Sequence, residues 1–215
     1  MDLIRIDTRK AYENIHEKIT TLQLKPGSVL NDQELAEEVG LELKPVREAL
    51  TLLAHDGLVN FSDQGMYVSD INVSELEQLS ELRLQLETFC AQLAAERASP
   101  DDLAVLEALR SEQAAIDPDE IERLFDLDHK FHQAIAAASG NRYLARALEQ
   151  LFGQSQRLWY LVLPELEFLP DAVETHLDLL KAIKAGDGVG AAGIMHDHVK
   201  SFYDKVKAIL LSNEV

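Results

Sequence analysis

The spacing of helix stop signals changes near residue 70, and this change constrains the fold more than any other feature of the sequence. Before it, glycine and proline residues interrupt the chain at short intervals, whereas after it apolar residues recur at helical spacing through long stretches rich in Leu, Ala and Glu. We therefore expect two domains, residues 1–70 and residues 71–215, in a mainly α-helical protein.

The first domain carries the signals of a winged helix-turn-helix. A first helix is expected over residues 9–24, a second after the capping pair Asn31 and Glu34, and a third ending at Gly57. Two β-prone runs on either side of Gly65 predict a terminal hairpin. Three short helices followed by a hairpin are typical of a domain whose third helix enters the major groove of DNA.

The second domain is predicted to be an antiparallel six-helix bundle, because long amphipathic segments are joined by short loops marked by Pro and Gly. The expected helices cover approximately residues 74–98, 100–116, 118–139, 141–163, 171–185 and 188–211.

Four polar side chains fall on apolar faces of these predicted helices. Asp128 and His132 share one stripe of the segment RLFDLDHKFHQAI, and His176 and His198 lie on the stripes of two later helices. An unsatisfied buried polar group costs about 1 to 3 kcal/mol, so the four groups are expected to satisfy one another. A divalent metal ion would do so, and zinc is preferred, with nickel, manganese and iron as alternatives. A single buried histidine is more often hydrogen-bonded than metallated.

Composition limits the classes of partner and the compartment. The net charge of -18 argues against a general binder of nucleic acid or anionic membrane, although a local basic patch remains compatible with it. No stretch resembles a membrane span or a signal peptide, and the one cysteine, Cys90, cannot form an intrachain disulfide. We expect a cytoplasmic protein.

The sequence resembles GntR-type bacterial transcription regulators in its first domain, through LKPGSVLNDQELAEEVG and PVREALTLLAHDGLV. The second domain resembles the FCD effector domain of the FadR subfamily, through ELRLQLE, DLDHKFHQAIAAASGN, HLDLLKAIKAGD and MHDHV. Together these motifs cover nearly the whole chain. The resemblance implies a homodimer that binds a two-fold operator and responds to a small organic acid.

The resemblance also implies site residues. Metal-containing members bind one divalent ion through an Asp, a His four residues later and two further His, which correspond here to Asp128, His132, His176 and His198. A carboxylate effector could complete the coordination of that ion, and Arg83 is a candidate second anchor for it. The alternative for Arg83 is an ion pair with Glu87, one helical turn later.

The residues expected to contact DNA differ from those that GntR members commonly carry. Glu42, Leu43 and Lys44 stand where members commonly carry Ser-Arg-Thr, and Gln64 replaces the usual Arg before Gly65 of the wing. Residues 1–70 hold 7 Lys and Arg against 13 Asp and Glu, a formal charge of -6.

Lys44, Arg47 and Gly65 remain the candidate DNA contacts, unless Arg47 pairs with an acid such as Glu48 or Glu38. The unusual residues Glu42, Leu43 and Gln64 either weaken the affinity for DNA or change the sequence specificity of binding.

Two functions therefore remain open. The favoured one is a DNA-binding regulator, not an enzyme, whose helical domain binds a small carboxylate at a divalent metal. The alternative is a metal sensor or a metalloenzyme bundle with a weakened DNA-binding domain. Against an enzyme, no further acid or base stands at motif spacing to the four candidate ligands.

Overall fold

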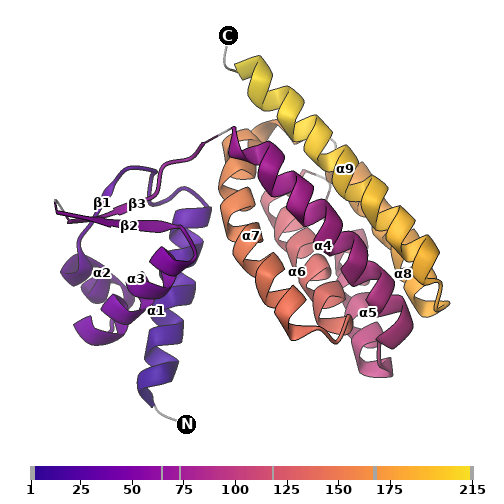
Figure 1. The fold of residues 1–215 in the computed structure, drawn as a ribbon, viewed down its shortest axis with the longest axis horizontal. Helices are drawn as coiled ribbons and strands as arrows, with labels where there is room; N and C mark the ends of the chain where they lie inside the picture. Colours follow the sequence, from indigo (N-terminus) through magenta and orange to yellow (C-terminus); the bar gives the residue numbers. More distant parts are fainter. Residues whose placement is uncertain (1–2, 64, 73, 118, 167–168, 214–215) are drawn as a thin grey trace. The chain divides into compact units, whose positions relative to one another are not determined.

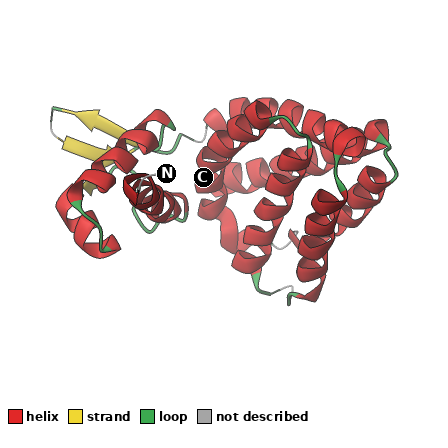
Figure 2. Ribbon diagram, turned by 90° about the horizontal axis from the view of Figure 1, so that it is seen from below, coloured by secondary structure: helices red, strands yellow, loops and turns green. Residues whose placement is uncertain are grey.

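The protein is mainly helical with one small sheet (Figures 1 and 2). The computed structural model describes residues 3–63, 65–72, 74–117, 119–166 and 169–213. Packing divides the chain into two compact units, residues 1–73 with 152–161, and residues 74–151 with 162–215. The prediction of a mainly α protein with a winged helix-turn-helix and a helical bundle is confirmed.

The first unit contains the predicted three helices and hairpin, together with a short strand that the sequence did not predict. Its elements are α1 (Leu3–Thr20), β1 (Val29–Leu30), α2 (Asp32–Val39), α3 (Leu43–His55), β2 (Val59–Ser62) and β3 (Gly65–Val68). The sheet is antiparallel in the order β1-β3-β2, with Val29 and Asn60 both opposite Tyr67. The prediction of a first helix over residues 9–24 is wrong in its bounds: α1 ends at Thr20, before a turn in which Leu22 has a positive φ of 62°.

Local signals explain how α2 and α3 form. The side chain of Asn31 accepts hydrogen bonds from the backbone N–H groups of Gln33 and Glu34, and Gly40 ends α2 in the left-handed conformation. Helix α3 packs mainly on α1. Their facing apolar stripes form the centre of the core and consist of Ala11, Ile15, Ile19, Val46, Ala49, Leu50 and Leu53.

The helices of the bundle agree with the predicted segments to within a few residues. They are α4 (Glu75–Arg97), α5 (Pro100–Ala115), α6 (Ile121–Ala138), α7 (Arg142–Val162), α8 (Leu169–Lys184) and α9 (Gly188–Asn213), with a 3-10 turn over Leu163–Glu165.

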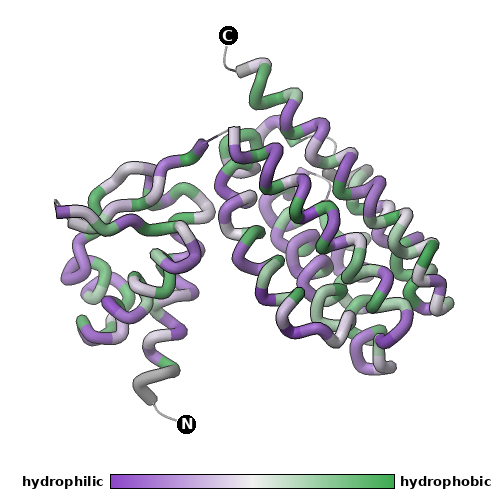
Figure 3. The backbone as a smooth tube through the Cα atoms, viewed as in Figure 1, coloured by the Kyte–Doolittle hydropathy of each residue, from purple (hydrophilic) through white to green (hydrophobic). Residues whose placement is uncertain are grey.

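Helix α4 packs most extensively on α9, while α6 contacts α4, α5 and α8 (Figure 1). Hydrophobic and hydrophilic residues alternate along these helices, as expected when one face of each is buried (Figure 3). In the described part of the chain, no helix combines the length and the apolar character needed to cross a membrane.

Candidate functional site

Asp128, His132, His176 and His198 lie together inside the bundle. One ligand atom from each residue lies within 4.8 Å of those of the other three. Asp128 and His132 come from α6, His176 from α8 and His198 from α9. These residues belong to separate helical stripes in the sequence, and the structure shows that the stripes converge at one point.

Helix packing buries this cluster. His176 is completely buried, and Asp128 and His198 are each 7% exposed. The ring of Phe131 stacks on that of His176 with 4.3 Å between the centroids, which fixes the plane of the imidazole. Four polar side chains are thus held in an apolar environment where unsatisfied groups are costly.

Each histidine uses its Nδ1 atom to contact a different residue outside the cluster. His132 Nδ1 contacts the carboxylate of Glu87 on α4. His176 Nδ1 lies 3.2 Å from Gln113 Oε1 on α5, and His198 Nδ1 lies 2.7 Å from Thr175 Oγ1 on α8. None of these contacts was predicted from the sequence, although Gln113 shares a stripe with Leu106 seven residues earlier, which is a usable signal of its burial.

These contacts assign the protons of the imidazoles. Glu87 and Gln113 each present an oxygen that can only accept, and the Thr175 hydroxyl already donates to the carbonyl oxygen of Ala172 at 2.6 Å. We therefore assign Nδ1–H to all three histidines, which leaves an Nε2 lone pair on each neutral ring.

The Nε2 atoms of the three histidines lie close to one another and to the carboxylate of Asp128. His198 Nε2 lies 3.1 Å from His132 Nε2 and 3.4 Å from His176 Nε2. Asp128 Oδ1 lies 3.4 Å from His176 Nε2 and accepts no hydrogen bond from the described residues. Ligands about 2.1 Å from a zinc ion are separated by roughly 3 to 3.4 Å at right or tetrahedral angles. The donor atoms suit a divalent metal ion, and these three spacings agree with its coordination, whereas His132 Nε2 lies farther from Asp128 Oδ1, at 3.9 Å.

Electrostatics distinguish His132 from the other two histidines. Burial and the neighbouring His132 lower the pKa of His198 to about 3, and burial likewise lowers the pKa of His176. For His132, burial also lowers the pKa, but Glu87 and Asp128 more than compensate and raise it. Burial would raise the pKa of Glu87, yet Arg83 and His132 lower it to about 2. A proton on His132 therefore competes with a cation for Nε2.

Arg83, the candidate effector anchor, is engaged within the protein. Its guanidinium lies 2.6 Å from Glu87 Oε1, and both side chains are buried. It also lies over the ring of Tyr203, 5.7 Å from the centroid. The structure thus contains the ion pair with Glu87 that is the alternative role of this arginine.

The candidate DNA contacts lie on α3 and at the wing. Lys44 and Arg47 are exposed. Arg47 Nε pairs with Asp32 Oδ2 at 2.6 Å, so Asp32 replaces the partners considered from sequence, Glu48 and Glu38. Those two acids are engaged elsewhere, because Glu48 accepts the Thr8 hydroxyl at 2.7 Å and Glu38 pairs with Lys18.

The family departures at this end have structural consequences. Glu42 is the N-cap of α3 and makes no side-chain capping hydrogen bond. Leu43 is partly buried and packs on the core of the winged helix. Gly65 begins β3 with a φ of 124°, a conformation that favours glycine, whereas Gln64 lies outside the described residues.

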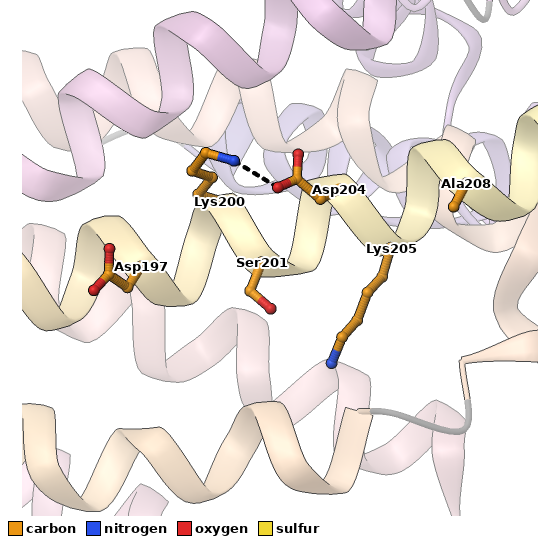
Figure 4. A pocket seen from close by; sticks show the side chains of 6 residues that line it. All are labelled: Asp197, Lys200, Ser201, Asp204, Lys205 and Ala208. Atoms are coloured by element: carbon orange, nitrogen blue, oxygen red, sulfur yellow. Dashed lines mark hydrogen bonds and ion pairs between the residues drawn. The ribbon is translucent and has the colours of Figure 1, made fainter.

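A surface hollow on α9 is a less suitable site than the buried cluster. It is lined by Asp197, Lys200, Ser201, Asp204, Lys205 and Ala208 (Figure 4). All six residues are exposed, and Lys200 pairs with Asp204 at 2.6 Å in the manner of a solvated helix surface. His198 lies on the buried face of the same helix.

A winged helix-turn-helix followed by a helical domain is an arrangement expected of a DNA-binding regulator. Residues 7–68 match the bacterial regulatory proteins of the gntR family, and residues 78–201 match the FCD domain. The chain belongs to the GntR family of transcription regulators, in its FadR-like subfamily, and the relatives it matches are named as transcriptional regulators and not as enzymes.

Full-length relatives support this assignment. An uncharacterized HTH-type transcriptional regulator of Streptomyces ambofaciens is 31% identical, over 95% of this chain and 87% of its own length. The HTH-type transcriptional repressor RspR of Escherichia coli K12 is 25% identical, over 95% of this chain and 91% of its own length. The solved structure of E. coli McbR/YncC has a TM-score of 0.85 at 25% identity and covers 98% of this chain and 100% of its own.

Proposed function

We propose that this regulator binds one divalent metal ion in its helical domain and that a small carboxylate effector at the ion controls binding to operator DNA. Asp128, His132, His176 and His198 would hold the ion, with zinc preferred and nickel, manganese and iron as alternatives. One observation carries the proposal: three imidazole nitrogens and one carboxylate converge in a buried space, where a divalent ion, or a proton on His132 in its absence, would relieve their repulsion.

The effector class follows from charge. A divalent ion held by one carboxylate and three neutral imidazoles keeps a net positive charge and offers an anionic ligand a coordination position. Arg83 belongs to this proposal as the candidate second anchor, because it is buried beside the cluster. Burial raises the pKa of Asp128, and the positive charges of His132 and Arg83 act against that rise. An effector would have to share or displace Glu87 to reach it.

For the DNA-binding end, we propose that Lys44 and Arg47 on α3 and Gly65 at the wing contact the operator. Arg47 uses Nε to pair with Asp32, which leaves its two terminal nitrogens available for a guanine or a phosphate. A homodimer would place two such units on a two-fold site in the bacterial cytoplasm, with the half-site spacing set by the dimer.

A DNA-binding experiment tests this function. Binding to the promoter region of the protein's own gene would be measured by gel shift, with zinc-loaded and chelator-treated protein, and with acetate, lactate or citrate as probes. The proposal expects an organic acid to change the DNA affinity of zinc-loaded protein only. If zinc alone changes DNA affinity and no acid adds to the effect, the metal-sensor alternative is correct. If neither zinc nor any acid changes affinity, the proposal is wrong.

A further inference from the structure

Glu87 links the candidate metal cluster to a helix that contributes no ligand to it. One of its carboxylate oxygens contacts His132 Nδ1, and the other lies 2.6 Å from an Arg83 terminal nitrogen. Arg83 and Glu87 are one turn apart on α4, whereas His132 is on α6. The side chains thus form a continuous row of contacts, Arg83 to Glu87 to His132.

The three outer partners of the histidines differ in charge. Gln113 and Thr175 offer His176 and His198 an amide and a hydroxyl oxygen, whereas Glu87 offers His132 a carboxylate that also pairs with Arg83. A carboxylate that accepts the Nδ1 proton fixes the ring orientation and makes Nε2 a better electron donor toward a metal. His132 should therefore be the strongest of the three imidazole ligands.

We propose that Glu87, held in place by Arg83, is the positioning residue that orients His132 and sets the affinity of the cluster for its metal ion. This inference rests on the proposed metal binding. Glu87 itself would not bind the ion, because its oxygens are engaged by His132 and Arg83. Mutations of such outer partners of metal-binding histidines typically weaken metal binding by about 10- to 100-fold.

The decisive comparison is between two glutamates on α4. Glu87→Gln keeps an oxygen acceptor but removes the charge, and Glu81→Gln makes the same chemical change at an exposed position of the same helix. Zinc affinity would be measured for the full-length chain by competition with a chromophoric chelator, and helix content by circular dichroism. We expect roughly 10- to 100-fold weaker binding in Glu87→Gln and unchanged binding in Glu81→Gln.

A second variant and a second measurement test the role of Glu87 even if Glu87→Gln does not fold. Glu87→Gln leaves the buried Arg83 without its counter-ion, so the double variant Arg83→Gln/Glu87→Gln removes both charges and should show the same loss of zinc affinity. In the wild-type protein loaded with cadmium-113, histidine nitrogen NMR should show a protonated Nδ1 and a cadmium-coupled Nε2 for His132.

The possible outcomes separate this inference from the metal proposal. Coupling of cadmium to His132 Nδ1, or wild-type zinc affinity in folded Glu87→Gln or in the double variant, would overturn the role of Glu87 while metal binding stands. Failure of the wild-type protein to bind zinc or cadmium would overturn the proposed function and this inference with it.

Discussion

The Nε2 atoms of His132 and His198 lie 3.1 Å apart, although 66 positions separate the two residues in the sequence. Both rings use their Nδ1 atoms elsewhere, on Glu87 and Thr175. In two neutral rings of this tautomer, neither Nε2 can donate a proton to the other. The close approach is therefore unfavourable by itself and becomes favourable when both nitrogens share a cation.

Replacing His176 or His198 with alanine should remove a ligand and lower both metal content and thermal stability. The replacement also removes packing, so the metal-dependent part must be isolated by adding a chelator to the wild type and to each variant. We expect chelator to lower the melting temperature of the wild type and to have little effect on the variants. His196→Ala, at a partly exposed position of α9, is the matched control and should behave like the wild type.

Arg83→Lys distinguishes a direct from an indirect role of this residue. Lysine keeps the positive charge but cannot reproduce the forked contact of a guanidinium with a carboxylate. If Arg83 anchors the effector directly, the rise in melting temperature caused by organic acids should shrink while zinc affinity stays the same. If Arg83 acts only through Glu87, zinc affinity should fall as well. Equal acid-induced shifts and equal zinc affinity in the two proteins would assign Arg83 a purely structural role.

Cys90 should be unreactive in the folded protein. Burial raises the pKa of its thiol to about 12, from an ordinary value of 9.0. Because only the thiolate reacts quickly, a raised pKa lowers the reactive fraction at every pH below 12. Ellman's reagent at pH 8 should modify Cys90 slowly in native protein and rapidly after unfolding in guanidinium chloride. Equal rates in the two states would contradict the buried position of Cys90.

Glu42→Ser should stabilise the first unit. A serine at the N-cap of α3 can accept a backbone hydrogen bond that Glu42 does not accept, which typically contributes about 1 kcal/mol. Chemical unfolding should show this gain for Glu42→Ser and less of it for Glu42→Ala, the control that lacks a capping oxygen. No difference between the two variants would mean that α3 gains nothing from a cap.

Arg47→Ala should weaken operator binding. If Arg47 contacts a phosphate, the slope of log affinity against log salt should become shallower by about 0.9, whereas a guanine contact would reduce affinity for the operator more than for random DNA. Asp32→Asn is a useful companion variant, because it removes the carboxylate that holds Arg47 Nε. Unchanged affinity of Arg47→Ala for both DNAs would exclude Arg47 from the interface.

Much of the fold was readable from the sequence because each helix carries its own signals. Asn31 and Ser99 cap the helices that follow them, and apolar spacing identifies their buried faces. The errors occurred where local signals are weak. Helix α1 ends at Thr20 without a proline or glycine at that point, and the two-residue strand β1 exists only because β3 pairs with it.

The four candidate metal ligands were predictable for a related reason. Polar groups on an apolar stripe are conspicuous, so Asp128, His132, His176 and His198 could be selected one helix at a time. Their convergence depends on how α6, α8 and α9 pack, and periodicity carries no information about that. The outer partners were missed because Glu87 reaches His132 across 45 positions and Gln113 reaches His176 across 63.

For the candidate DNA contacts, the unusual residues could be identified from the sequence, but their structural roles could not. The departures at Glu42 and Leu43 were visible in the sequence, but the role of Leu43 was not. Its side chain packs partly on the core of the first unit, so Leu43→Arg is expected to cost stability as well as to add a positive charge near DNA. Effects of that variant on DNA binding must therefore be compared at matched folded fractions.

Elemental analysis of the purified protein, combined with its melting temperature before and after chelation, tests whether the bundle holds a metal ion. We expect about one equivalent of a divalent metal per chain and a lower melting temperature after chelation that zinc restores, because an ion bound only by the native state stabilises it. Less than about a tenth of an equivalent, after incubation with zinc, together with a melting temperature that chelator leaves unchanged, would contradict it.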